Sequence, residues 1–376
     1  MSRETTVDII PHPPAGVCNP PTTWEPTLPS RGEGELGASP LPGAGRGAGG
    51  EGRTRIFSGI QPTGSLHLGN YVGAVQNWVR MQETHDCSIC IVDLHALTIE
   101  YDPQTYQERV TGMAIDLLAC GIDPARTILF VQSHVPEHAE LQWLLATIAP
   151  LGALERMTQY KDKAEQHKDN LNLGLLAYPV LQAADILLYK AQAVPVGEDQ
   201  VQHLELTREI ARKFNHRFGA VFPEPQTILT RARRLPGLDG LGKMSKSKGN
   251  TIEITESAEE IWAKLRPAVT DPARKRRSDP GNPNNCPIGL MHYAISSPEQ
   301  QDYITWGCTT AGIGCIECKK ILNENVNALL APIRARRAEL AERPDDVRDV
   351  LREGAERASA IARQTMREVR AAMGLA

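Results

Sequence analysis

The spacing of apolar and polar residues changes near position 255, and the change divides the chain into two predicted architectures. Before it, short apolar runs rich in β-branched residues alternate with segments of helical spacing. Such runs are typical of strands that are buried on both faces. They are TRIFSGI (54–60), CSICIVDLHAL (87–97) and TILFVQS (127–133). Strands that alternate with helices predict βαβ units and therefore a parallel sheet.

Two helices are predicted between these strands. The segment 68–82, LGNYVGAVQNWVRMQ, has helical spacing with its large apolar residues on one side. The second helix is predicted from Pro103 to Cys120, because Asp102 is a suitable N-cap and proline is favoured at the first helical position. Ligands of parallel sheets bind at the carboxyl ends of strands, beside helix N-termini. We therefore expect a binding site at the first strand–turn–helix.

Beyond residue 255 the strand pattern fades and amphipathic helical segments follow. The sequence thus predicts an α/β fold, with a Rossmann-like parallel-sheet domain at 54–255 and an α-helical region at 256–376. Residues 1–53 are rich in glycine and proline and poor in large apolar side chains. Such a segment buries too little surface to offset its ordering entropy, so we expect a disordered extension.

Composition narrows the class of protein without naming a partner. Of 376 residues, 41% are hydrophobic and 23% charged, as in ordinary soluble proteins. The net charge of −4 excludes a global positive field, and the local runs RARR (231–234), RKRR (274–277) and RARR (334–337) are each more typical of a solvated face. No apolar stretch is long enough for a membrane span, and the N-terminus resembles neither a secretory signal nor a transit peptide. A cytoplasmic protein is expected.

Two short stretches carry candidate chemistry. SGIQPTGSLHLGNYVGA (58–74) frees the backbone with glycines and puts His67 and Asn70 at the start of a helix, where unpaired N–H groups suit a phosphate. The alternative is a glycine-rich loop around a buried histidine. The stretch is neither a Walker A loop nor the G-x-G-x-x-G fingerprint. KMSKSKGN (243–250) is either a solvated loop or a grip on a polyanion.

Taken together, HLGN and KMSKS resemble the paired signatures of class I aminoacyl-tRNA synthetases. The wider sequence resembles the bacterial-type tryptophanyl-tRNA synthetases, segment by segment and in order over 54–376. The segments are FSGIQPTGSLHLGNYVGA, CIVDLHALT, ERMTQYKDK, GLLAYPVLQAADILLY, VPVGEDQVQHLELTREIARKFN and KMSKS. The resemblance implies that L-tryptophan and ATP form tryptophanyl-adenylate and pyrophosphate, and that tryptophan then passes to tRNA(Trp).

The resemblance also implies a nucleotide site. Because the attacking carboxylate is already anionic, catalysis would rest on positioning and on neutralising phosphate charge. The expected catalytic residues are Lys243, Lys246, Lys163 and His67. The lysine loop would close over the triphosphate through Lys243, Met244, Ser245, Lys246 and Ser247. The rest of the nucleotide would be held by Gln61, Pro62, Thr63, His67, Gly69, Asn70, Gly73, Gly197, Glu198, Asp199 and Leu235. Mg²⁺ would accompany ATP without a dedicated protein ligand.

For the amino acid, the resemblance implies that Asp185 accepts the indole N–H, since indole has one donor and no acceptor. Tyr178 and Gln200 would hold the ammonium group. The ring pocket would be shaped by Phe57, Gly59, His95, Val194 and Val196. Gln182 departs from the methionine frequent in tryptophanyl enzymes and matches the glutamine of tyrosyl enzymes. Phe57 favours tryptophan again, because a tyrosyl enzyme offers a tyrosine hydroxyl there.

Eight cysteines fall into two groups. Cys87, Cys90 and Cys120 lie in or beside predicted core elements and are interpreted as structural, and Cys18 lies in the extension. The other four have the spacing C-x21-C-x6-C-x2-C, which suits zinc or a [4Fe–4S] cluster. They are Cys286, Cys308, Cys315 and Cys318. Resemblance to a subset of tryptophanyl enzymes favours the cluster; zinc and an empty site are the alternatives.

The helical half would bind the tRNA anticodon, with its last helix packing back on the catalytic domain and RKRR meeting tRNA phosphates. A homodimer is expected, and HAELQWLLATIAPLGALERM (138–157) is apolar enough for its interface, although a core helix is the alternative. Three other functions stay open: a tyrosine-specific enzyme, a nucleotidyl-transferring enzyme that loads no tRNA, and a regulatory paralogue. Residues 1–53 would give the last of these a surface for an unknown protein partner.

Overall fold

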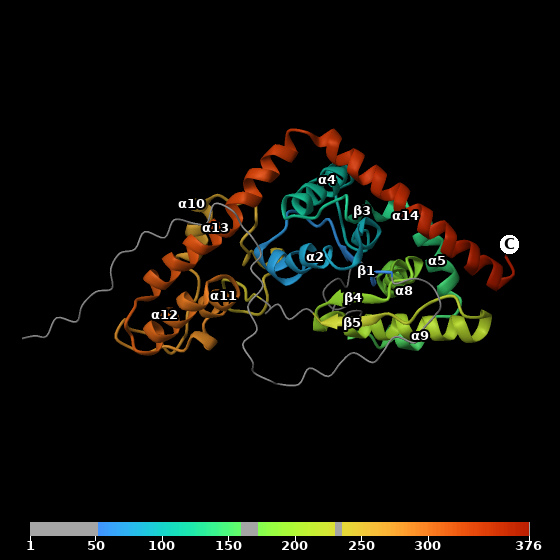
Figure 1. Ribbon diagram of the computed structural model, residues 1–376. Coiled ribbons are helices and arrows are strands. Elements are labelled where there is room, and N and C mark those ends of the chain that lie inside the picture. The colour runs from blue at the N-terminus through green and yellow to red at the C-terminus, as the bar shows by residue number, and fades with distance from the viewer. Residues whose placement is uncertain (1–51, 159–171, 230–234, 376) are drawn as a thin grey trace, which may run out of the picture. The chain divides into compact units, whose positions relative to one another are not determined.

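The structure is a computed structural model that describes residues 52–158, 172–229 and 235–375. Its centre is a five-stranded parallel sheet of order β3-β2-β1-β4-β5 (Figure 1). The strands are β1 Arg55–Ile60, β2 Asp86–Ile91, β3 Thr127–Val131, β4 Ala193–Val196 and β5 Gln226–Leu229. The predicted α/β class and parallel sheet are confirmed. Most of the expected extension, residues 1–51, lies outside the described residues.

The central position of β1 places the site. It pairs with β2 on one side and with β4 on the other, so the chain's crossovers reverse direction at β1. In open parallel sheets the crevice at such a switch point, outside the carboxyl ends of the strands, is where ligands bind. The loops that follow β1 and β4 therefore face the same crevice.

Helices are present where the sequence predicts them, at 103–120 and beyond residue 255. In the first half the helices are α1 Leu68–Asn70, α2 Gln76–Met81, α3 Asp93–Ala96, α4 Pro103–Ala119, α5 Glu137–Ala146, α6 Leu151–Glu155, α8 Leu173–Leu188 and α9 Val201–Phe218. The helices α5 to α9 were not predicted. The helical half consists of α10 Ala258–Leu265, α11 Pro287–Ile295, α12 Pro298–Thr309, α13 Cys315–Ala341 and α14 Pro344–Met373. In α4 the Asp102 side chain accepts from the Gln104 N–H, as predicted for its N-cap.

The single helix expected over 68–82 is instead three pieces, because a π-helical turn, Tyr71–Val75, separates α1 from α2. Gly73 lies in the middle of this turn, and glycine weakens a regular α-helix by about 1 kcal/mol relative to alanine. Wide turns of this kind are frequent at functional sites. This one directly follows the candidate nucleotide turn.

Alternate residues of the central strands enter two different cores, one on each face of the sheet. Ile89 and Leu129 belong to a core shared with α4 and α13, whereas Cys90 and Phe130 belong to a core shared with α5 and α8. This arrangement explains why the β2 sequence is a continuous apolar run rather than an alternating one. It also explains why the apolar composition sufficed to predict these strands.

Helix α14 packs directly on β3 at the edge of the sheet (Figure 1). The contact is at Gly354, where an added Cβ would lie 1.8 Å from the carbonyl oxygen of Leu129. On one side of this glycine α14 contributes Leu351 to the first core, and on the other it contributes Ala358 to the second. A side chain at 354 would push the helix off the strand.

Among the described residues, none of the helices is both long enough and apolar enough to cross a bilayer.

Candidate active site

The first turn and the lysine loop lie together, although about 175 residues separate them along the chain. The Leu68 N–H donates to the Ile252 carbonyl (2.7 Å) and the Ile254 N–H donates to the Leu66 carbonyl (2.9 Å). These bonds flank an antiparallel bridge between His67 and Glu253. The segment that leaves the lysine loop is therefore fixed, by backbone bonds, to the turn that follows β1.

His67 caps the short helix α1. Its Nδ1 accepts from the Asn70 N–H (3.1 Å), and the Asn70 Oδ1 accepts from the His67 N–H (3.3 Å). Burial, followed by the nearby charges of Lys246 and Lys243, lowers the pKa of His67 to about 4. Imidazole is neutral at pH 7 in this setting. Because Nδ1 is an acceptor, the single proton is on Nε2, which makes that atom a hydrogen-bond donor.

Lys246 reaches back to the first turn. Its Nζ donates to the Thr63 carbonyl (3.4 Å) and lies 3.2 Å from where a Cβ on Gly64 would stand. Gly64 has φ of +109°, a conformation that L side chains rarely adopt. Burial lowers the pKa of Lys246, and Glu253 and Asp116 oppose this shift. The ammonium is thus held over the turn without a close carboxylate partner in hydrogen-bonding range among the described residues.

The loop after β4 joins the same crevice. Lys243 Nζ lies 3.7 Å from the Asp199 Oδ2, with the lysine side chain 64% exposed. Gly197 and Glu198 precede that aspartate at the carboxyl end of β4. An exposed pair of this kind contributes little stability and separates easily when a stronger anion arrives. The lysine loop therefore contacts both the first turn and the loop after β4.

Of the other residues expected at the nucleotide, two are buried in the core and three lie in the turn after β1. Met244 is 4% exposed and belongs to the core, close to Gly69, so its side chain is not free in the loop. Leu235 accepts from the Met244 N–H and is likewise buried. Gln61, Pro62 and Thr63 follow β1 directly. Lys163 lies outside the described residues, and so does the basic run 231–234. The side chain of Ser247 is also not described.

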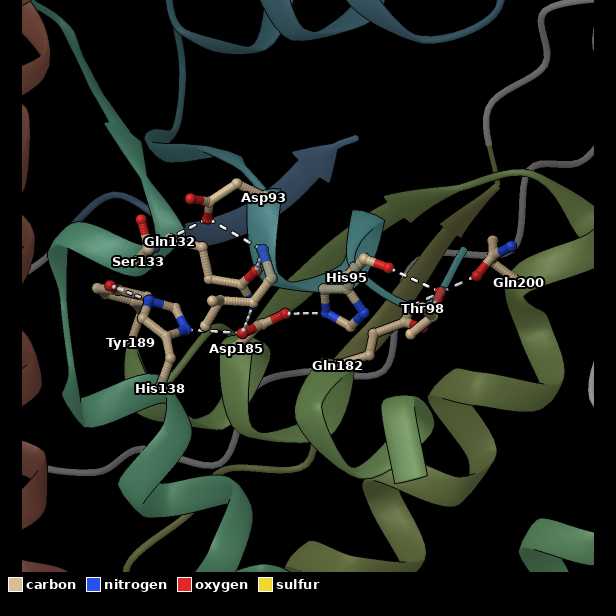
Figure 2. A network of polar contacts seen from close by, with 11 residues as sticks. Asp93, His95, Thr98, Gln132, Ser133, His138, Gln182, Asp185, Tyr189 and Gln200 are labelled. Atoms are coloured by element: carbon tan, nitrogen blue, oxygen red, sulfur yellow. Dashed lines mark hydrogen bonds and ion pairs between the residues drawn. The ribbon is translucent and has the colours of Figure 1, made fainter. Parts of the chain in front are cut away.

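Asp185 is the centre of a buried polar network (Figure 2). Its Oδ1 accepts from Gln132 Nε2 (2.7 Å) and His138 Nδ1 (2.6 Å), and its Oδ2 accepts from His95 Nε2 (2.7 Å). Burial alone would raise the pKa of Asp185, but the two histidines outweigh it and lower the value to about 2. The carboxylate is ionised, so each histidine nitrogen facing it carries the proton.

The network continues to the neighbouring aromatic rings. His138 Nε2 lies within hydrogen-bonding distance of the Tyr189 hydroxyl, at 2.8 Å. The Tyr189 ring stacks on Phe57, with centroids 5.5 Å apart and an interplanar angle of 7°. His95 meets the Tyr178 ring edge-on at 6.2 Å. Three of the expected tryptophan residues, Phe57, His95 and Asp185, are therefore joined through this network.

The other expected tryptophan residues surround it. Gln182 Nε2 donates to Gln200 Oε1 (3.4 Å), which links α8 to the turn after β4 (Figure 2). A Cβ on Gly59 would stand 2.8 Å from a Val92 methyl, so any larger residue there would displace the Val92 side chain. Val194 is buried in β4, and Val196 ends the same strand half-buried. The binding roles of these residues stay predictions.

Sequence reasoning missed Gln132, His138 and Tyr189. Gln132 follows directly after β3, and the rule that ligands gather at strand carboxyl ends could have found it. His138 and Tyr189 offered no such signal, because one lies on α5 and the other just beyond α8, and only the tertiary fold brings them together. Asp93, also unpredicted, orders the local loops by accepting from the Leu94 and Ser133 N–H groups.

The four cysteines of the helical half lie in three different elements. Cys286 precedes α11, Cys308 lies in α12, and Cys315 and Cys318 form the first turn of α13. Burial raises the pKa of Cys318 to about 12, with the other three thiols adding to the effect, so the four are electrostatic neighbours. Within residues 52–158, 172–229 and 235–375, however, no cluster of three or more candidate ligands is close enough to hold a metal ion. The iron–sulfur prediction is therefore not confirmed.

The other described cysteines are buried free thiols, as the structural interpretation requires. Cys90 packs in the core beneath α8, whereas Cys87 packs in a small separate cluster. The two side chains therefore do not share a ligand.

Comparison with known proteins gives a consistent family. A family model described as class I tRNA synthetases (W and Y) matches residues 50–331. The chain is 56% identical to a tryptophan–tRNA ligase of Deinococcus radiodurans, over 85% of this chain and 98% of that one. It is 51% identical to a tryptophan–tRNA ligase of Thermotoga maritima, over 85% and 99%.

Solved structures agree. The tryptophanyl-tRNA synthetase of Campylobacter jejuni, complexed with ADP and tryptophan, has a TM-score of 0.77 and 36% identity, over 86% of this chain and all of that one. A tyrosyl-tRNA synthetase of Archaeoglobus fulgidus, complexed with L-tyrosine, has a TM-score of 0.61 at 22% identity, over 76% and 90%. The latter shows the shared fold alone.

Proposed function

The chain belongs to the class I tRNA synthetases for tryptophan and tyrosine, and we infer that it is a tryptophan–tRNA ligase. It activates L-tryptophan with ATP to tryptophanyl-adenylate and pyrophosphate, and then transfers tryptophan to tRNA(Trp). The observation that carries this conclusion is the 56% identity with a tryptophan–tRNA ligase over 98% of that enzyme's length.

We propose that the crevice above β1 and β4 performs the activation. The tryptophan carboxylate attacks the α-phosphorus, its new bond to phosphorus forms, and the bond to the pyrophosphate oxygen breaks. No general base is needed, since the nucleophile is already an anion. Lys246 and Lys243 would neutralise charge on the phosphoryl oxygens and on the leaving pyrophosphate, with Mg²⁺ bound to the ATP. Neutral His67 would donate from Nε2.

The lone pairs of Asp185 support tryptophan as the substrate. An ionised carboxylate has about four acceptor positions, and Gln132, His138 and His95 use three of them. One position remains, on Oδ2, which matches the single N–H of an indole. A tyrosine hydroxyl would also need a donor for its own oxygen, and Phe57 provides none.

Gln182 favours the alternative, a tyrosine-specific enzyme. Its amide is engaged with Gln200, which leaves its carbonyl oxygen for a substrate group. Pyrophosphate exchange measured with each amino acid decides between the two substrates. We expect exchange with tryptophan and, at equal concentration, at least about 100-fold less with tyrosine, because an unpaired buried hydroxyl costs about 1–3 kcal/mol and steric mismatch adds to it. Preference for tyrosine would overturn the assignment.

We propose that the chain works as a homodimer through α5, α6 and the start of α8. Large apolar side chains are left exposed there: Trp143 by 69%, Leu151 by 58% and Leu173 by 77%. Such a cluster on a soluble protein marks an interface. A monomer in sedimentation equilibrium at micromolar concentration would contradict this.

We also propose that residues 256–376 bind the tRNA and that the four cysteines ligate a cofactor there. Two buried cations support the cofactor. Arg274 is 9% exposed and its Nε has no hydrogen-bond partner, while Lys319 is 4% exposed and donates only to the Arg266 and Ala268 carbonyls. Neither forms an ion pair with a described residue. Unpaired buried cations are costly, so this environment requires negative charge.

Deprotonated cysteines would supply that charge. Four thiolates on a dication, whether zinc or an iron–sulfur core, carry a net charge of roughly −2, which two cations balance. When bound, the group would crosslink the start of α13 to α11 and α12. Anaerobic purification tests this: brown protein with broad visible absorbance indicates [4Fe–4S], colourless protein with one equivalent of zinc indicates the alternative, and metal-free protein refutes both.

The remaining proposals concern cellular context. We propose the cytoplasm as the compartment, since the product serves protein synthesis there. A regulatory role or protein partner would use residues 1–53. Deleting these residues and comparing aminoacylation with partner capture separates a catalytic role from a binding role of the extension.

A further inference from the structure

Helix α12 carries two aromatic side chains that the fold leaves in water. Tyr303 is 43% exposed and Trp306 is 57% exposed. Their ring centroids are 6.1 Å apart with an interplanar angle of 34°, as their spacing of three residues on one helix allows. Neither ring belongs to a core cluster. Tyr303 and Trp306 thus form an exposed aromatic surface, called the platform below.

The platform adjoins a basic hollow. The Trp306 ring covers Gly312, 3.2 Å from where a Cβ would stand, and the Arg277 guanidinium donates to the Gly312 carbonyl (3.4 Å). From there a hollow of about 660 Å³ extends along residues 274–277 to Lys320. It is lined by five cationic side chains and one carboxylate, Glu317.

Arg274 is buried and is the cation assigned above to the cysteine site. The other four cations of the hollow are exposed: Lys275, Arg276, Arg277 and Lys320. None of its lysines and arginines forms an ion pair with another described residue. The chain as a whole has a net charge of −4, so this surface is a local exception to its electrostatics. Concentrated positive charge with a deficit of acidic partners selects a polyanion.

Aromatic rings beside free cations select unpaired nucleotides in particular. Bases that are already stacked in a duplex cannot lie on a protein ring, whereas splayed bases of an RNA loop do, and each stacked base contributes about 1–3 kcal/mol. We propose that the Tyr303–Trp306 pair stacks an unpaired base of the tRNA, while Arg276 and Arg277 hold the phosphates beside it. This deepens the proposed function and rests on tRNA being the substrate.

Trp306→Ala and Tyr303→Ala test the proposal, with Trp306→Phe as the conservative variant. Because one stacked base contributes about 1–3 kcal/mol, we expect each alanine variant to raise the tRNA KM by about 5- to 100-fold and Trp306→Phe to retain most of the affinity. Pyrophosphate exchange needs no tRNA and should stay unchanged. Tyr101→Ala is the matched control, since Tyr101 is 42% exposed and lies far along the chain from α12.

Direct binding separates stacking from charge. The probes are a stem–loop RNA with the anticodon loop and the same stem as a blunt duplex. Trp306→Ala should weaken binding of the stem–loop RNA and leave binding of the blunt duplex unchanged. The double variant Arg276→Ala, Arg277→Ala should lower the salt dependence of binding by about one unit of slope per lost phosphate contact. The control is Arg217→Ala, in a second basic hollow that Arg212 and Lys213 also line. The Arg217 guanidinium lies over the half-buried Phe218 ring, 5.0 Å from its centroid, and not beside an exposed aromatic pair.

Each outcome decides something different. An unchanged tRNA KM for both alanine variants would overturn the platform, as would equal weakening of stem–loop and duplex. Equal losses in Arg217→Ala and in the double variant would remove the assignment to this hollow. Absence of tryptophan-dependent pyrophosphate exchange in the unmodified protein would instead refute the proposed function.

Discussion

The Arg337 guanidinium donates from Nε to Asp116 Oδ1 at 2.7 Å, and Asp116 is fully buried. The other oxygen, Oδ2, accepts from the Leu66 N–H at 2.9 Å. Leu66 directly precedes His67, the residue that caps α1. One carboxylate on α4 thus ties helix α13, from the helical half, to the backbone of the nucleotide turn.

Replacing Arg337 by alanine should lower the free energy of unfolding by about 1–3 kcal/mol near neutral pH, because it removes the charged partner of a buried carboxylate. Arg336→Ala changes the exposed neighbour on the same helix and should cost less than about 0.5 kcal/mol. Urea unfolding measures both. Equal midpoints for the two variants would show that the pair contributes nothing.

The same variant has a predictable pH dependence. Burial raises the pKa of Asp116, against the Leu66 N–H and Arg337, which lower it. A carboxyl with a raised folded pKa favours the folded state when protonated, and this contribution is lost as pH rises through that pKa. Without Arg337 the pKa rises further. The stability loss in Arg337→Ala should therefore be larger at pH 7.5 than at pH 5, and the reverse order would be inconsistent with this environment.

Lys246→Met should reduce kcat for pyrophosphate exchange by about 10²–10³-fold, the usual effect of losing one group that stabilises transition-state charge. The methionine keeps most of the volume over Gly64. Lys248→Met is the control, because Lys248 lies in the same loop with its Nζ directed to the Leu241 carbonyl instead. If both variants lost activity equally, the effect would belong to the loop's net charge rather than to Lys246.

Asp185→Asn should lower kcat/KM for tryptophan by about 10- to 100-fold, since a charged acceptor is replaced by a neutral one. Asp302→Asn, on the exposed face of α12, should leave exchange unchanged.

The lowered pKa of Asp185, about 2, also determines how its contribution to the free energy of unfolding depends on pH. The contribution is present above the ordinary aspartate pKa and is lost as pH falls toward 2. Between pH 5 and pH 8, exchange rates should show no break from this residue.

Gly354→Ala should destabilise the protein by about 1–3 kcal/mol or more, because the new methyl meets the Leu129 backbone oxygen, which cannot rotate away. Gly112→Ala, in α4, is the opposite case. No atom lies within 4 Å of a Cβ there, so the exchange should stabilise by about 0.5–1 kcal/mol. Thermal unfolding of the two variants provides the comparison.

Strands and helix ends were predictable wherever a local cause fixed them. The apolar runs of β2 and β3 reflect burial on both faces, and the start of α4 reflects Asp102 and Pro103. Strands β4 and β5 have four residues each, too few for a pattern, and were not predicted. The π turn after α1 depends on packing as well as on Gly73, and was also missed.

The candidate site divides in the same way. The resemblance predicts that HLGN and KMSKS lie together. It does not predict the backbone hydrogen bonds of Leu68 and Ile254 that hold them there, because those bonds depend on the tertiary structure. The charge of Asp185 could not be derived from its sequence context. It depends on His95 and His138, which are 90 and 47 residues away along the chain.

The position of Gly354 against β3 also bears on how the enzyme is made. Helix α14 follows all five strands along the chain, so the edge strand β3 stays uncovered until this helix has been synthesised. An uncovered edge invites pairing with other chains. Chains truncated before this helix should therefore aggregate rather than fold into partly active synthetases.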